Sequence, residues 1–174
     1  DYCHSNKIDS ISNHQFDKII SQTPIEDTVT LTYSQNSLYH DQQLIGTKVL
    51  ISNSDSQSDA KKFIGSMAWI ILEFEDWSMI PIENLIAASQ DTPTKIAAKI
   101  RTPEEAQGAG FALETGVDAL IVEYEQDMIE AAFIIKSQRG EQGDTKLVES
   151  SNSDEIIIAQ HKIKSIEQGG IGER

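Results

Sequence analysis

The feature that most restricts the fold of this chain is a repeated change of pattern between short apolar segments and amphipathic ones. Apolar and β-branched segments predict buried or half-buried strands, and they cover residues 28–33, 48–52, 68–73, 95–100 and 119–122. Helical patterns follow, at residues 59–66, 82–90, 102–115 and 126–137. Buried strands with helices between them predict a parallel sheet that is covered by helices.

The predicted fold class is therefore α/β, built from parallel βα units that resemble part of a TIM barrel. The pattern leaves an open, doubly wound sheet as the alternative. About five strands precede Gly140, which is little more than half a barrel. Alternating residues at 155–159 and 161–166 then predict antiparallel strands, the start of a β-rich domain.

Three parts are expected along the chain. Residues 1–27 form a polar N-terminal segment, residues 28–149 form the βα-repeat domain, and residues 150–174 form a β extension that begins a truncated second domain. The boundary falls in a linker rich in Ser, Asn and Asp. Residues 17–20 are expected to end a short helix, residues 53–58 to form a polar loop, and Gly140 and Gly143 to mark a turn.

The composition excludes several classes of function. The 174 residues carry 28 acidic and 14 basic side chains, a net charge of −14, which argues against binding to nucleic acid or to an anionic membrane surface. The single cysteine, Cys3, excludes an internal disulfide framework and a cysteine-based zinc site. The longest apolar run, at 67–72, is too short to span a bilayer.

Three weaker patterns favour ordinary structural roles. Residues 53–59 alternate oxygen-bearing side chains like a calcium loop, but they lack its glycine at the sixth position and its glutamate at the twelfth. Gly108 and Gly110 are followed by Leu113 where a dinucleotide fingerprint needs glycine, so close helix packing is the better interpretation. The four histidines are far apart, and no metal site is predicted.

The segment after the strongest strand is the first candidate site. Four carboxylates fall within the eleven residues 73–83, beside Trp77, where α/β folds gather functional groups. Asp76 and Glu83 are the candidate acid and base. The structural alternative is that Asp76 caps a turn, Glu83 favours a helix start and Trp77 covers the core.

Lys99 and Arg101 close the next strand. Lys99 shares a strand face with Lys95 and Ala97, and an inward lysine near the end of a barrel strand could act as an amine catalyst or a substrate clamp. The structural alternative is an ion pair of Lys99 with Glu73 or Glu123. Both interpretations remain open from the sequence.

Blocks of this chain closely resemble the 3-dehydroquinate synthase II family, the archaeal-type enzyme that is also found in cyanobacteria and some algae. The resemblance lies in residues 71–73, 76–77, 80–81, 83–87, 95–100, 103–106, 113–121 and, in a last block, 166–167, 170 and 172–174. In the last block Gln168 and Gly169 stand where the family has proline and an aliphatic residue, and Glu173 replaces an aspartate. Because the family continues with a β-rich second half, the resemblance implies that this chain corresponds to the N-terminal half only.

The resemblance implies a particular chemistry. The family converts 2-amino-3,7-dideoxy-D-threo-hept-6-ulosonate to 3-dehydroquinate by NAD-dependent oxidative deamination and ring closure, on the route to aromatic amino acids. It implies Asp76 and Glu83 as catalytic residues, and Asn84, Glu173 and Arg174 as substrate-binding residues. Lys99 is held as a further catalytic candidate and Arg101 as a further substrate-binding one. No residue points to the NAD site.

Two other functions stay open at this stage. The chain could be a non-catalytic acidic binding module, or an aldolase-type barrel enzyme that uses Lys99 as a Schiff base. The expected ligand is a small amino sugar acid, with no nucleic acid or membrane partner, and the chain is expected to form a homo-oligomer or to assemble with a missing C-terminal half. The expected location is the cytoplasm, or a plastid if the source is an alga.

Overall fold

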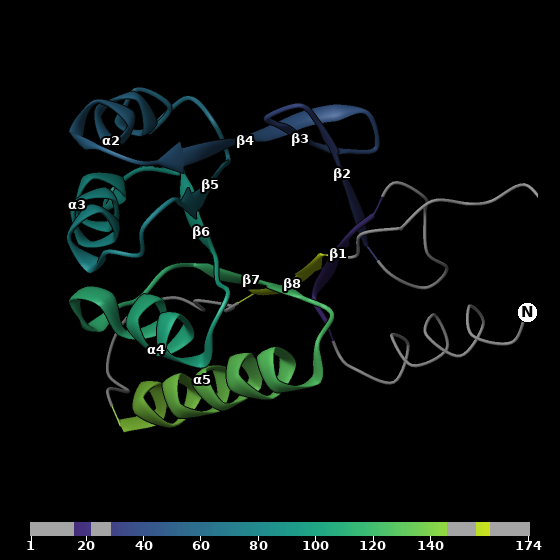
Figure 1. The fold of residues 1–174 in the computed structure, drawn as a ribbon, viewed down its shortest axis with the longest axis vertical. Helices are drawn as coiled ribbons and strands as arrows, with labels where there is room; N and C mark the ends of the chain where they lie inside the picture. The colour runs from purple at the N-terminus through teal and green to yellow at the C-terminus, as the bar shows by residue number, and fades with distance from the viewer. Residues whose placement is uncertain (1–15, 22–28, 146–155, 161–174) are drawn as a thin grey trace, which may run out of the picture.

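The computed structural model describes residues 16–21, 29–145 and 156–160, and in it eight strands join edge to edge into a closed ring (Figure 1). The strands are β1 (Lys18–Ile20), β2 (Thr30–Ser34), β3 (Ser37–His40), β4 (Gln43–Ile51), β5 (Trp69–Phe74), β6 (Lys95–Lys99), β7 (Ala119–Glu123) and β8 (Ile156–Gln160). All neighbouring pairs are parallel except those of β3, which is antiparallel to β2 and β4. The predicted α/β class with parallel βα units is confirmed.

Helices lie on the outside of the ring beside β4 to β7 (Figure 1). They are α2 (Ser54–Lys61), α3 (Met79–Ser89), α4 (Pro103–Phe111) with the short 3₁₀ turn η1 (Ala112–Glu114), and α5 (Gln126–Thr145). Each of α2, α3 and α4 connects two neighbouring parallel strands. This is the βα repeat that the sequence pattern predicts.

The period of two along the strands divides the core into two layers. On β5, Ile70 and Leu72 face outward and pack with Ile82 and Leu85 of α3. Trp69 and Ile71 face the barrel interior, where they pack with residues of other strands. Burying one isoleucine or leucine side chain in either layer contributes about 1.5–3 kcal/mol. Every second residue of these strands therefore faces the interior of the ring, and the polar residues at such positions near the strand ends lie at its mouth.

The predicted loop at residues 53–58 is wrong, because α2 begins at Ser54. The side chain of Asn53 accepts hydrogen bonds from the backbone N–H groups of Asp55 (3.0 Å) and Ser56 (2.9 Å), and the Ser56 hydroxyl accepts from the Asn53 N–H in return. These polar side chains form an N-cap rather than a loop. The alternating oxygen-bearing side chains that resemble a calcium loop therefore belong to the cap and first turns of α2.

The predicted turn at Gly140 and Gly143 is also wrong, because α5 continues to Thr145. Its buried residues include Met128, Ile129, Ala132 and Ile135, which are spaced for one helix face. Tertiary packing of such a face supplies most of the stability of a helix in a protein, so two glycines near the end do not stop it.

Residues 17–20 do not end a helix. Lys18–Ile20 form β1, with parallel pairings to β2 and β8, and Ile19 and Ile20 are both buried. Three strand residues give too short a pattern to separate a strand from a helix end, and only the pairing decides it.

The β2–β3–β4 hairpins and the direction of β8 were not predicted. The two hairpin turns use Gln35, Asp41 and Gln42 at positive φ, although glycine and asparagine are the usual sequence signals there. β8 pairs parallel with β7 and β1, so the antiparallel prediction is wrong for this strand. Residues 161–166 lie outside the described part of the chain, and the proposed domain boundaries stay a prediction.

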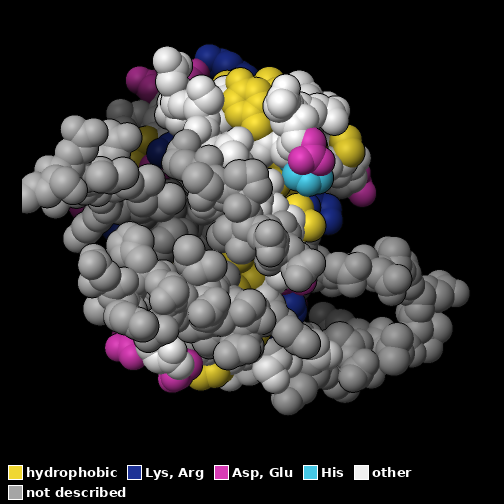
Figure 2. All heavy atoms as spheres, turned by 90° about the vertical axis from the view of Figure 1, so that its right-hand side faces the viewer, with side chains coloured by type: hydrophobic (Ala, Val, Ile, Leu, Met, Phe, Trp, Pro, Cys, Tyr) yellow, Lys and Arg dark blue, Asp and Glu magenta, His cyan; other side chains and the backbone are white. Residues whose placement is uncertain are grey.

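The described part of the surface is mixed in character. Hydrophobic, acidic and basic side chains are interspersed on the described part of the face shown in Figure 2, where the histidine side chain lies beside an acidic one. None of the helices that the structure describes is both long and apolar enough to cross a membrane.

Candidate functional site

Four charged side chains meet at the carboxyl ends of β4 to β7. The register pairs Leu50 with Glu73 and Lys99 with Ile121, and Ile71, Ala97 and Ile121 line the barrel interior. Because side chains alternate along a strand, Lys48, Glu73, Lys99 and Glu123 share this inner face. These four residues are named here the mouth cluster.

Glu73 is the centre of the mouth cluster. Its Oε2 lies 3.0 Å from Lys48 Nζ and its Oε1 lies 3.2 Å from Lys99 Nζ. Lys99 Nζ also lies 3.5 Å from Glu123 Oε1. The side chains of Lys48, Glu73 and Lys99 are 27%, 26% and 19% exposed, against 56% for Glu123. Partial burial reduces solvent screening of the first three charges.

The electrostatics of the cluster favour an ionised Glu73. Burial acts to raise its pKa, but hydrogen bonds and attraction from Lys48 and Lys99 outweigh burial, and the net pKa is lower than the ordinary value. Nearby, burial and then the charge of Glu73 raise the pKa of Tyr33, so its hydroxyl stays protonated. Lys48 Nζ lies 5.5 Å from the centroid of the Tyr33 ring, within cation–π range.

The structure shows the ion pair that was the structural alternative for Lys99, and it forms with both Glu73 and Glu123 rather than with one of them. It also adds Lys48 and Tyr33, which sequence reasoning missed. The only signal for Lys48 was its place in an apolar strand pattern, and its partner follows from the register. The mouth cluster contains two cations and two anions, and the neutral phenol of Tyr33 lies beside it, an arrangement that suits the binding of a small charged molecule. Among the described residues, no group of three His, Cys, Asp or Glu side chains could hold a metal ion.

Asp76, Glu83 and Asn84 lie apart from these contacts. Asp76 is exposed in the loop between β5 and α3, Glu83 is half-buried in α3, and Asn84 is exposed on the same helix. Within the described ranges, none of these side chains bonds to the mouth cluster. Asp76, Glu83 and Asn84 therefore make no direct contact with Lys99 among the described residues, and their predicted roles stay predictions.

Trp77 packs against the hydrophobic core, which is the structural role that the sequence left open for it. Its ring lies 5.1 Å from that of Phe74 in an edge-to-face arrangement, and it packs against the Gly108 backbone, where an added Cβ would lie 3.3 Å from the indole. Gly110 likewise faces Ile135 of α5. The prediction that these glycines allow close packing of helix α4 is confirmed.

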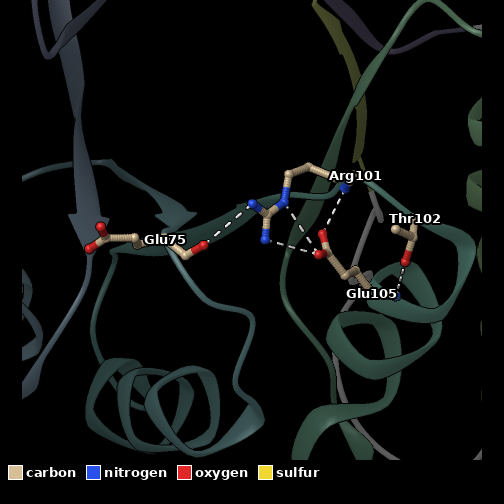
Figure 3. A network of polar contacts seen from close by, with 4 residues as sticks. All are labelled: Glu75, Arg101, Thr102 and Glu105. Atoms are coloured by element: carbon tan, nitrogen blue, oxygen red, sulfur yellow. Dashed lines mark hydrogen bonds and ion pairs between the residues drawn. The ribbon is translucent and has the colours of Figure 1, made fainter.

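Arg101 is held by Glu105 at the start of α4 (Figure 3). Glu105 accepts from the Arg101 backbone N–H (2.7 Å), Nε (3.3 Å) and Nη2 (3.1 Å), and Arg101 Nη1 reaches the carbonyl of Glu75 at 3.5 Å. Thr102 Oγ1 accepts from the Glu105 N–H at 3.2 Å. The predicted N-cap is confirmed, but Glu105 turns to Arg101 rather than completing a capping box. Glu173 and Arg174 lie outside the described residues.

The described residues do not fit a dinucleotide. A pyrophosphate binds at free N–H groups of a helix N-terminus, but α2, α4 and α5 carry carboxylates in their first turns. Helix α3 has none in its first turn, yet Glu75 and Asp76 precede it. The glycines of α4 face Trp77 and Ile135 rather than an open cradle.

Fold and site together define an α/β barrel whose charged side chains gather at the carboxyl ends of its parallel strands, the end that carries the active sites of barrel enzymes. Residues 5–136 match the family model described as 3-dehydroquinate synthase II N-terminal domain. The chain belongs to this family. No solved structure gives a significant match.

Curated relatives support the same family. A 3-dehydroquinate synthase of Methanococcoides burtonii is 29% identical over 130 residues, which cover 75% of this chain and 31% of the relative. The proteins of the same name from Nitrosopumilus maritimus and Archaeoglobus fulgidus are 38% identical over 72 residues and 28% identical over 105 residues. These matches cover 41% and 60% of this chain and 20% and 28% of those relatives. The chain therefore matches less than a third of the length of each of these relatives.

Proposed function

We propose that this chain provides the substrate-binding barrel of a 3-dehydroquinate synthase. The family match and the printed name of the relatives support this activity. The mouth cluster is the observation that supports a particular binding site for this activity. Its residues Lys99 and Glu73 face inward at the carboxyl ends of two neighbouring parallel strands. Barrel enzymes place their reacting groups at this end.

The finer reaction is NAD-dependent oxidative deamination and cyclisation of 2-amino-3,7-dideoxy-D-threo-hept-6-ulosonate. This part, with NAD as the cofactor, rests on the family resemblance. Asp76 and Glu83 are proposed to exchange protons with the substrate, and Asn84, Arg101, Glu173 and Arg174 are proposed to bind it. Association with another copy or another segment, and a cytoplasmic location, stay predictions.

The mouth cluster favours a clamp over a Schiff base. An amine attacks a carbonyl only in its neutral form, whereas Lys99 lies between the carboxylates of Glu73 and Glu123, an arrangement that uses the ammonium form. Borohydride reduction in the presence of the substrate should therefore leave Lys99 unmodified in a peptide mass spectrum. A reduced substrate adduct on Lys99 would instead support the aldolase-type alternative.

The test uses the native protein that carries this chain. Incubation with the amino sugar acid and NAD should release 3-dehydroquinate and ammonia, measured by mass spectrometry and a coupled ammonia assay. Lys99→Met and Glu83→Gln should each abolish product formation while the circular dichroism spectrum stays unchanged. Lys62→Met, an exposed lysine after α2, is the matched control and should keep the wild-type rate. Absence of 3-dehydroquinate with the wild-type protein would overturn the proposed function.

A further inference from the structure

Glu73 holds two lysine ammonium groups from two different strands. Lys48 contacts one carboxylate oxygen and Lys99 contacts the other, at 3.0 and 3.2 Å. Each ammonium carries three donors, so neither is saturated by Glu73 alone. The two cations are thereby fixed on either side of one carboxylate, at the inner face of the barrel mouth.

Glu123 is the weakest member of the cluster. Its contact with Lys99 is the longest of the three, at 3.5 Å, and its side chain is 56% exposed. An ion pair of this length and exposure contributes little, in the range of about 0–1 kcal/mol. An incoming anion can therefore replace Glu123 at Lys99 at small cost, whereas Glu73 is held by two partners.

We propose that Lys48 and Lys99 form a two-cation clamp for the carboxylate of the ligand, and that Glu123 is the counter-ion which this carboxylate displaces. The inference rests on the proposed function for the identity of the ligand. Glu73 is a positioning residue, since it orients both ammonium groups. Displacement conserves charge, because one carboxylate leaves Lys99 as another arrives. The protonated Tyr33 beside Lys48 adds no competing negative charge.

The experiment measures binding of 2-amino-3,7-dideoxy-D-threo-hept-6-ulosonate to the native protein by isothermal titration calorimetry without NAD. The second probe is the same molecule with a carboxamide in place of its carboxylate. The variants are Lys48→Gln, Lys48→Arg and Glu123→Gln. The matched controls are Lys62→Gln and Glu125→Gln, both at exposed positions outside the cluster. Urea unfolding of each variant establishes that the fold is kept.

Lys48→Gln should weaken binding of the carboxylate about tenfold, and Lys48→Arg, which keeps the charge, should recover most of the affinity. Glu123→Gln should tighten binding about two- to fivefold, because the competing counter-ion is gone. The carboxamide should bind weakly to all variants, and the controls should match the wild type.

Either of two binding results would overturn the clamp, and so would one kinetic result. Unchanged affinity in a folded Lys48→Gln protein would show that Lys48 does not contact the ligand, and weaker binding in Glu123→Gln would show that Glu123 contacts the ligand directly. The failure of the proposed function looks different: the wild type would then make no 3-dehydroquinate. Turnover with an unchanged KM in Lys48→Gln would overturn only the clamp.

Discussion

Oε1 of Glu73 lies 3.2 Å from Nζ of Lys99, across the boundary between β5 and β6. The other oxygen of the same carboxylate lies 3.0 Å from Lys48 on β4. One side chain thus links the carboxyl ends of three neighbouring strands. A charge inside a barrel is tolerated when it is paired in this way, and the pairing leaves the lysines ordered at the mouth.

Glu73→Gln should change how stability depends on pH. The pKa of Glu73 is lowered from the ordinary 4.5, so its ionised form stabilises the fold fully above about pH 4.5, and this stabilisation is lost as the pH falls through the lowered value. The variant should be less stable at neutral pH by about 1 kcal/mol, since the group is partly exposed. Its unfolding free energy, measured with urea, should fall less steeply than that of the wild type below pH 4.5.

Glu75→Gln is the control for this pH profile, because its side chain is exposed at the end of the same strand. It should reproduce the wild-type profile. If Glu73→Gln lost stability with acid as steeply as the wild type, the ion pairs of Glu73 would not account for its lowered pKa.

Glu105→Ala should destabilise the protein by about 1–3 kcal/mol. The Glu105 side chain is 9% exposed and accepts three hydrogen bonds from Arg101. Because Arg101→Ala removes two of the same bonds, the double variant should lose less stability than the two single losses added together. Additive losses in urea unfolding would show that the two side chains act independently.

Gly110→Ala should destabilise the packing of α4 on α5. An added Cβ at this position would collide with the branched side chain of Ile135, at a cost of about 1–3 kcal/mol that outweighs the better helix propensity of alanine. Gly140→Ala is the matched control, since nothing lies within 4 Å of an added Cβ there. It should raise the unfolding free energy by up to about 1 kcal/mol. Equal shifts in Tm for both variants would contradict this packing.

Thr102→Ala should cost about 1 kcal/mol in unfolding free energy, because the Thr102 hydroxyl accepts the Glu105 N–H at the start of α4. Ser78 occupies the same position before α3 but makes no capping hydrogen bond. Ser78→Ala should therefore leave the stability nearly unchanged, by the same urea measurement. A large loss with Ser78→Ala would mean that this hydroxyl has a role other than helix capping.

Local patterns predicted the elements whose signals are complete within one segment. The apolar run of β5 and the Thr102–Pro103 helix start appear where expected. Predictions failed where a distant partner decides the outcome. Three residues of β1 become a strand only through pairing with β2 and β8, and α5 passes Gly140 because its buried face packs on other elements.

The candidate site shows the same division. The inward lysine at position 99 and its two carboxylate partners were among the alternatives that the strand pattern left open, because period-two alternation and strand ends can be counted along the chain. Lys48 and Tyr33 could not be placed in this way. Lys48 is two residues before the register partner of Glu73, so its side chain must reach diagonally between strands, and β2 lies across two hairpins from β4.

The sequence alone therefore determined the fold class, the order of the central βα units and the residues that resemble the 3-dehydroquinate synthase II family. These are properties of local periodicity, helix capping and matching motifs. Only the tertiary structure decided that the described strands close into a ring and that Lys48, Glu73, Lys99 and Glu123 meet at its mouth. The reason is physical: ring closure and ion pairing depend on strand register, and register is set by contacts between residues far apart in the chain.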